Sequence, residues 1–114
     1  MINVIVVPEK EEYIEHVSHR NIVWINKDLG TPNLEGRNAK YLVPFWCTNE
    51  NRGAKRIYHI LDIKDNEITL GNSFVINKDW DNMGQYRKFE YHPLESFDFI
   101  EVKDGFLIPY DFQK

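Results

Sequence analysis

The stretch Lys55–Ile76, KRIYHILDIK-DN-EITLGNSFVI, decides the fold. Its first half, Lys55–Lys64, alternates between two faces and carries the aliphatic and aromatic side chains that strands favour. Asp65-Asn66 forms a tight turn, and Glu67–Ile76 is the returning strand, with Gly71 as the position of a bulge. The stretch therefore predicts a β-hairpin within a mainly β domain.

Further short strands are expected on both sides of this hairpin, because similar runs recur between turn-forming residues. They are expected at Ile2–Val7, Asn21–Asn26, Lys40–Thr48, Tyr86–His92, Phe97–Val102 and Phe106–Tyr110. Glu9–His19 has one apolar face and predicts a helix, and Pro44 is expected to bend its strand or place it at an edge. We predict one domain, residues 1–114, of the mainly β (α+β) class: a small antiparallel β-barrel or a curved sheet with one or two short helices.

The composition fits one globular domain, with 114 residues, 42% of them hydrophobic and 14% aromatic. The only cysteine, Cys47, lies in an apolar run, so we expect it to be buried. A lone thiol fits a reducing compartment. The short apolar N-terminus lacks the basic start of a signal peptide, and no run approaches the length of a membrane span. We expect a cytoplasmic protein without a membrane partner.

Charge is distributed unevenly along the chain. The net charge is −4, but residues 37–56 hold five cations and one carboxylate, a local excess of +4. The cations are Arg37, Lys40, Arg52, Lys55 and Arg56. Tyr41, Phe45 and Trp46 lie among them, and nucleic-acid sites combine cations for phosphate with flat rings for bases. The long polar loop Lys27–Ala39 precedes this span, and loops of that length are often functional.

Residues with catalytic potential are few. His16 and His19 share a side of the expected helix, and Glu12 or Glu15 could complete a metal site with them. Glu50 with Asp62-Ile63-Lys64 has the order of a metal-dependent nuclease, but Lys64 is expected to end a hairpin strand. No phosphate-binding, nucleophile-elbow or zinc-protease motif occurs. We therefore expect no enzyme, no cofactor and no metal.

The pattern of residues 40–71 resembles the PUA-like superfamily, particularly its EVE and ASCH branches. An apolar strand ends in aromatic residues (Tyr41–Trp46), a polar turn follows, and a second strand (Ile57–Ile63) leads through a tight turn to Ile68-Thr69-Leu70-Gly71. The resemblance implies a compact pseudo-barrel that binds RNA or a modified base in a cleft. The matching positions for that cleft are Trp24, Trp46, Asn49, Asn51 and Arg52.

Two functions follow as hypotheses. The first is a non-catalytic binding module for nucleic acid or a modified nucleotide, with RNA, DNA or a modified base as its partner. In it, the aromatic residues Trp24 and Trp46 stack on bases, and Arg37, Arg52 and Lys55 contact phosphate. Asn49 and Asn51 of the turn belong to the same predicted nucleic-acid site, as residues that line its cleft. The second is a small protein-interaction domain whose acidic faces dock on a basic partner, such as an inhibitor or adaptor of phage or bacterial defence.

Overall fold

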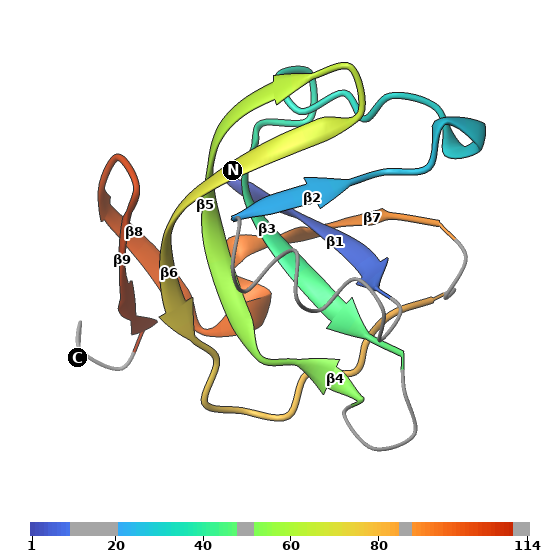
Figure 1. Cartoon of the computed structure of the whole chain (residues 1–114). Coiled ribbons are helices and arrows are strands. Elements are labelled where there is room, and N and C mark those ends of the chain that lie inside the picture. Colours follow the sequence, from blue (N-terminus) through green and yellow to red (C-terminus); the bar gives the residue numbers. More distant parts are fainter. Residues whose placement is uncertain (10–20, 48–51, 85–87, 111–114) are drawn as a thin grey trace.

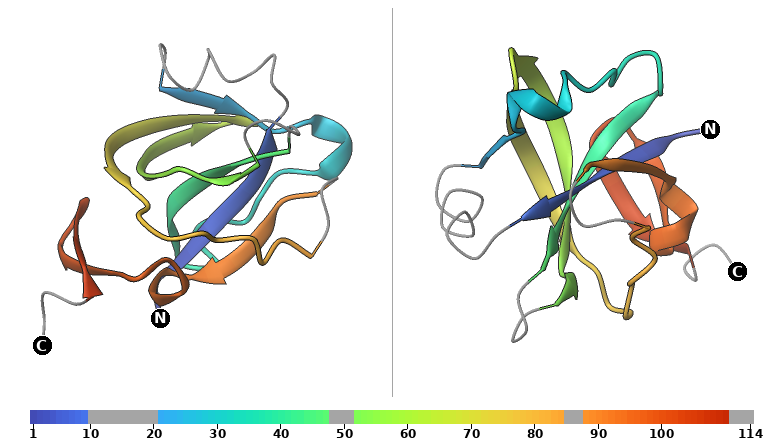
Figure 2. Two further views of the ribbon diagram at one scale, coloured as in Figure 1. Left: turned by 90° about the horizontal axis from the view of Figure 1, so that it is seen from below. Right: turned by 90° about the vertical axis from the view of Figure 1, so that its right-hand side faces the viewer.

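The computed structural model describes residues 1–9, 21–47, 52–84 and 88–110. A seven-stranded sheet has the order β2-β6-β5-β3-β1-β7, with β4 paired to β3 off this path, and β8-β9 forms a separate hairpin. The strands are β1 (Asn3–Glu9), β2 (Ile22–Trp24), β3 (Ala39–Trp46), β4 (Gly53–Ala54), β5 (Arg56–Lys64), β6 (Glu67–Val75), β7 (Glu90–Pro93), β8 (Phe99–Lys103) and β9 (Phe106–Pro109). The sheet curls like half of a barrel (Figures 1 and 2), which confirms the predicted mainly β class with a curved sheet.

The hairpin predicted from residues 55–76 is β5-β6, which we call the central hairpin. Lys64 pairs with Glu67 across the two-residue turn, and Asp65 has a φ of 55°, which such turns require. The register shifts twice. His59 of β5 lies opposite Gly71 and Asn72, which is the predicted bulge, and Leu61 is an extra residue on β5 itself. The two bulges let the long hairpin curve with the sheet.

One pair of strands is parallel, which the prediction of an antiparallel sheet did not include. β1 lies beside β3 from Val4 opposite Tyr41 to Glu9 opposite Trp46 without interruption. Pro44 therefore lies in an inner strand rather than at an edge. On the other side of β3, the pairing changes from β5, at Tyr41 and Leu42, to β4, at Phe45 and Trp46. Pro44 falls between the two ladders, so its missing N–H costs no strand hydrogen bond there.

Both faces of the sheet are covered. Val4, Val6 and Tyr41 face one core, which Trp80, Phe97 and other apolar residues complete. Leu42 and Ile5 face a second core shared with β2 and β6. Burial on both faces explains why β1 is an almost continuous aliphatic run.

One expected helix falls almost entirely outside the described residues, and one expected strand begins later than predicted. Of the expected helix Glu9–His19, only Glu9 is described, and it ends β1, while residues 10–20 lie outside the described residues. The described helical turns are the 3₁₀ turns η2 (Lys27–Leu29) and η3 (Leu94–Phe97). Because η3 includes Phe97, β8 begins at Phe99 instead.

The segment that follows β6, residues 77–84, is anchored in the core. Trp80 is 2% exposed, stacks on Phe97 with ring centroids 4.7 Å apart, and meets Phe45 edge-on at 6.0 Å. Trp80 thus fills the core and is not a surface platform for a ligand.

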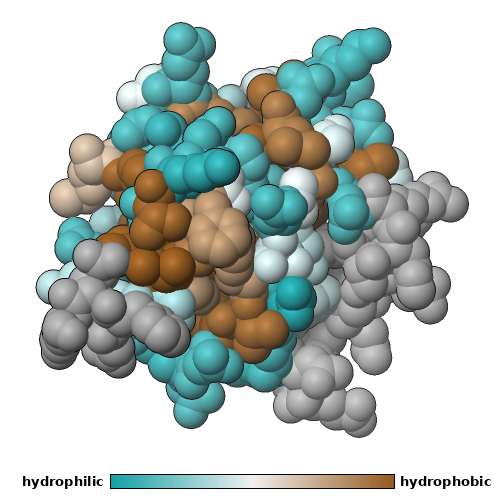
Figure 3. All heavy atoms as spheres, turned by 90° about the vertical axis from the view of Figure 1, so that its left-hand side faces the viewer, coloured by the Kyte–Doolittle hydropathy of each residue, from teal (hydrophilic) through white to brown (hydrophobic). Residues whose placement is uncertain are grey.

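Apolar side chains also gather on one outer face of the molecule, seen in Figure 3. Val75 on β6, Val102 on β8 and Phe106 on β9 are each about half exposed. Phe74 connects this surface to the interior, because its ring meets the exposed Phe106 at 5.6 Å and the buried Phe99 at 6.3 Å. In the described part of the chain, no helix has the length and apolar character needed to cross a membrane.

Candidate functional site

The loop between η2 and β3 is held by asparagine side chains. Asn33 Oδ1 accepts a hydrogen bond from the Gly36 N–H at 2.9 Å, and the Asn33 carbonyl accepts one from the Arg37 N–H at 3.1 Å. Asn3 donates to the Arg37 carbonyl and Asn38 to the Met1 carbonyl, both at 2.7 Å. These bonds fix the backbone of residues 33–38 against the start of β1, so that the loop side chains have defined positions.

A hollow of about 420 Å³ lies between this loop and the start of β7. We call it the basic hollow; its described lining residues are Leu29, Thr31, Pro32, Asn33, Arg37, Lys88, Phe89 and Tyr91. The Arg37 guanidinium carbon lies 5.2 Å from the centre of the Tyr91 ring, a cation–π distance. Phe89 meets Tyr91 edge-on at 5.9 Å, and the Tyr91 hydroxyl accepts a hydrogen bond from the Asn33 N–H. Strand and loop thus fix the two rings and the cation together.

The electrostatics of the basic hollow favour an anion. Arg37 and Lys88 are its charged residues, and no carboxylate is among the lining residues that the structure describes. Neither cation forms an ion pair with a described carboxylate, whereas Arg52 pairs with Asp81 and Lys40 with Glu101. A planar guanidinium above a ring presents its N–H donors to phosphate or carboxylate oxygens. The hollow can therefore hold a ligand that combines an anionic group with a flat ring.

The predicted site residues are not all brought together. Arg37 lies in the basic hollow. Trp24 is 44% exposed on β2 and Trp46 is buried on β3, and neither lines that hollow. Lys55 is exposed between β4 and β5. Asn49 and Asn51 lie outside the described residues.

Arg37 and Arg52 lie at opposite ends of β3. Arg37 precedes the strand, whereas Arg52 precedes β4, which pairs with the last two residues of β3. Eight residues at about 3.3 Å each separate the two ends by roughly 26 Å. β3 runs beside β1 in unbroken register from Tyr41 to Trp46 and does not fold back on itself in Figure 1. The basic span 37–56 is thus two separate basic surfaces.

Sequence reasoning missed Lys88, Phe89 and Tyr91. A signal was present, because Lys88-Phe89 and Tyr91 interleave a cation with aromatic residues. The surrounding span 87–114 has a net charge of −2, four cations against six carboxylates, which concealed that signal. Pairing of β7 with β1 brings these residues to the loop, and this long-range pairing has no local signature.

Cys47 differs from its prediction. The residue is exposed at the end of β3, so the expectation of a buried thiol is wrong. Partial burial of the thiol nevertheless raises its pKa. Beside it, Glu9 is 5% exposed, and burial raises the pKa of its carboxyl from 4.5 to about 8. A thiol with a raised pKa is a poor nucleophile at neutral pH, which gives no support to a catalytic cysteine.

No cluster of three or more metal-ligating side chains occurs within the described ranges, and His16 and His19 fall outside them. Lys64 ends β5 as expected, and Asp62 is exposed on that strand. Comparison with models of known protein families, with curated proteins and with solved structures gives no match. The resemblance to PUA-like domains therefore stays a prediction.

Proposed function

We propose that this chain is a non-catalytic binding module for nucleic acid or a modified nucleotide, and that the basic hollow is its binding site. The observation that carries the proposal is the placement of the Arg37 guanidinium 5.2 Å from the Tyr91 ring centre in a hollow that also holds Lys88 and Phe89. Cations and flat rings side by side match the two halves of a nucleotide, phosphate and base.

The ligand is a single strand or a single nucleotide rather than a duplex. A hollow of about 420 Å³ is of the size that takes a small planar group, and the base must be unstacked to enter it. The Thr31 hydroxyl donates its hydrogen to Asn66 Oδ1 at 3.0 Å, and its oxygen can still accept a hydrogen bond from the edge of a base. The sequence resemblance to PUA-like domains favours the same class of ligand.

The test is binding of fluorescein-labelled single-stranded oligonucleotides, ten residues of RNA or DNA, measured by fluorescence anisotropy over a range of salt concentrations. Saturable binding that weakens with salt supports the proposal, because phosphate contacts release counterions. A 5′-mononucleotide should compete, while the nucleoside without phosphate should compete less well. Absence of binding to every oligonucleotide and mononucleotide at low salt would remove the proposal.

A further inference from the structure

A second feature of the structure, an unpaired strand edge, lies on the other side of the loop 33–38. β5 pairs with β3 only at Tyr58 and His59. From Ile60 to Lys64, β5 pairs with β6 on one side. The opposite edge of this half of β5 has no strand partner in the part of the chain that the structure describes. Unpaired strand edges are where extended peptides add to a sheet.

A groove of about 630 Å³ runs along this edge. Its walls are the loop with the start of β3, the strand β5, and the tip of the β8-β9 hairpin. We call it the acidic groove and define it by Leu34, Glu35, Lys40, residues 60–63 and Asp104. The groove offers room for a chain beside the strand edge.

The apolar part of the groove comes from a bulge. Leu61 is the extra residue of β5, since Ile60 lies opposite Leu70 and Asp62 opposite Thr69. Bulges redirect side chains, and Leu61 is 60% exposed although it is a large aliphatic residue. Leu34 lies in the same groove, so an aliphatic side chain of a ligand would find apolar contacts.

The charge of the groove favours a cationic ligand. Glu35, Asp62 and Asp104 contribute carboxylates to the lining. Lys40 Nζ lies 3.9 Å from Glu101, which offsets its charge, and neither Glu35 nor Asp62 forms an ion pair with a described residue. Side chains of arginine or lysine would complement these carboxylates.

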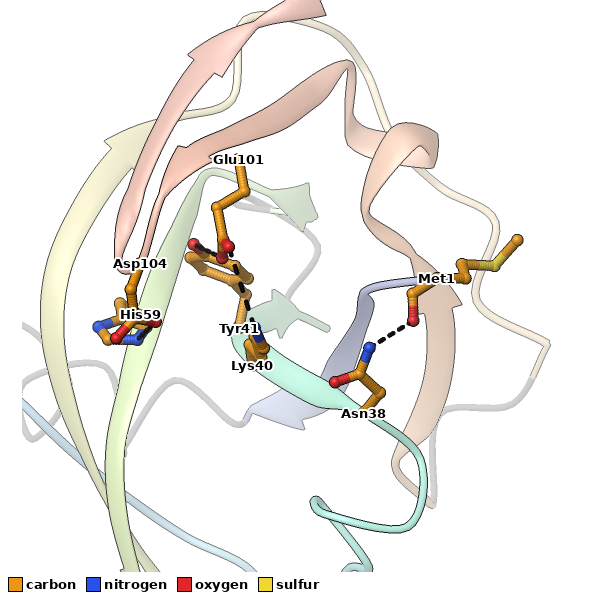
Figure 4. A network of polar contacts seen from close by, with 7 residues as sticks. All are labelled: Met1, Asn38, Lys40, Tyr41, His59, Glu101 and Asp104. Atoms are coloured by element: carbon orange, nitrogen blue, oxygen red, sulfur yellow. Dashed lines mark hydrogen bonds and ion pairs between the residues drawn. The ribbon is translucent and has the colours of Figure 1, made fainter.

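One end of the groove is held by the polar network in Figure 4. Tyr41 donates a hydrogen bond of 2.6 Å to Glu101. The Glu101 side chain therefore points inward, although a charged residue in the expected strand Phe97–Val102 would be expected to point to solvent. His59 Nε2 lies 3.6 Å from Asp104 Oδ1. A Cβ added at Gly105 would lie 2.8 Å from His59 Nδ1, so the hairpin tip packs closely on β5. The groove wall is thus built before any ligand binds.

We propose that the edge of β5 from Ile60 to Ile63 binds an extended, basic segment of a partner protein, which adds to the sheet as a further strand. Main-chain hydrogen bonds to this edge would give affinity. The Ile63 N–H now donates a hydrogen bond of 2.9 Å to Asp62 Oδ1, so this N–H becomes available to a partner only when the Asp62 side chain turns away. The carboxylates and Leu61 would select a sequence in which cationic and aliphatic residues alternate. This surface is separate from the basic hollow, so the proposal does not depend on nucleic-acid binding.

The test uses a fluorescein-labelled peptide, Arg-Val-Lys-Val-Arg-Val-Lys, and two N-methylated versions, one methylated at the valines and one at the basic residues. Alternate amides of an added strand face the sheet, so one version should lose at least tenfold in affinity and the other should bind like the parent. The amides of Ile60–Ile63 should gain protection from hydrogen exchange. The isosteric variant E35Q/D62N should bind the parent peptide about tenfold more weakly, and D79N/E95Q, of equal net charge, should bind it normally.

Three results would overturn the proposal. The first is no binding of the parent peptide at about millimolar concentration, the weak limit of specific recognition. The second is a failure of the strand-addition controls. Either both N-methylated versions bind equally well, or spermidine binds as tightly as the parent peptide, and each outcome would show a site for amines without strand addition. The third is protection of Ile60–Ile63 by self-association of the protein without peptide.

Discussion

The basic hollow and the acidic groove lie on opposite sides of one short loop and have opposite character. Asn33 and Arg37 line the hollow, whereas Leu34, Glu35 and Asn38 line the groove. Residues next to each other in sequence therefore serve two different surfaces. The hollow has aromatic rings and cations, and the groove has aliphatic side chains and carboxylates.

The difference shows how a chain with a net charge of −4 can present a site for an anion. The turns of the loop backbone direct Asn33 and Arg37 to one side and Leu34, Glu35 and Asn38 to the other, so the charge of each surface differs from the charge of the whole segment. The same asparagine bonds hold both surfaces, so damage to the loop should weaken binding at both. Changes at residues that line neither surface should affect stability alone.

The largest expected effect on the free energy of unfolding comes from Glu9, which lines neither the basic hollow nor the acidic groove. Because its pKa rises from 4.5 to about 8 on folding, the folded chain holds a proton that the unfolded chain releases. Stability should therefore fall as the pH rises from about 4.5 to 8, by up to about 1.4 kcal/mol per pH unit.

E9Q should remove this decline and leave oligonucleotide binding unchanged. Urea unfolding of both proteins at several pH values between about 5 and 8 measures the difference. Parallel stability curves for the two proteins would show that Glu9 ionises normally in the fold.

The next largest effect on stability is expected from the Tyr41–Glu101 hydrogen bond at one end of the acidic groove. Y41F removes the 2.6 Å hydrogen bond to Glu101, whose side chain is 14% exposed. A hydrogen bond to a charged group contributes about 1.5–3 kcal/mol, and we expect a loss in that range by chemical denaturation. Binding in the basic hollow should not change. A loss below about 0.5 kcal/mol would indicate that water replaces the hydroxyl.

A smaller effect on stability is expected from the loop itself. A Cβ at Gly36 would lie 2.2 Å from Asn33 Nδ2, so G36A should displace the Asn33 side chain and cost about 1 kcal/mol, the value of one hydrogen bond. Ligand binding at both surfaces should weaken together. G30A gives a contrasting control, because a Cβ there has open space and is strained only by the φ of 82°. If G36A binds both the oligonucleotide and the peptide normally, the asparagine bonds of the loop are not what positions the two surfaces.

Much of the fold was predictable because its signals are local. The alternation in 55–76 and the Asp65-Asn66 turn fix the central hairpin, and the turn at Asp104-Gly105 fixes the second. The parallel pairing of β1 with β3 was missed, since continuous aliphatic runs show burial but not direction. The inward position of Glu101 was also missed, because its partner Tyr41 is 60 residues away.

The site was less predictable than the fold. Loop 27–39 and Arg37 were identified from composition, and both contribute to the basic hollow. The rings that complete it, Phe89 and Tyr91, come from a strand whose position depends on long-range pairing. Arg52, predicted to contact phosphate together with Arg37 and Lys55, is held at the far end of β3 next to Asp81.

Two charge-reversal variants test the central claim most directly, because each changes the net charge equally. R37E/K88E alters the basic hollow, and R52E/K55E alters the other end of the basic span. Oligonucleotide affinity is measured by anisotropy as a function of salt. We predict that R37E/K88E binds at least tenfold more weakly and loses about 1.4 from the slope of log affinity against log salt, two contacts at roughly 0.7 each. R52E/K55E should keep most of its affinity. Strong loss in R52E/K55E with normal binding in R37E/K88E would contradict the assignment and place the site at the far end of β3.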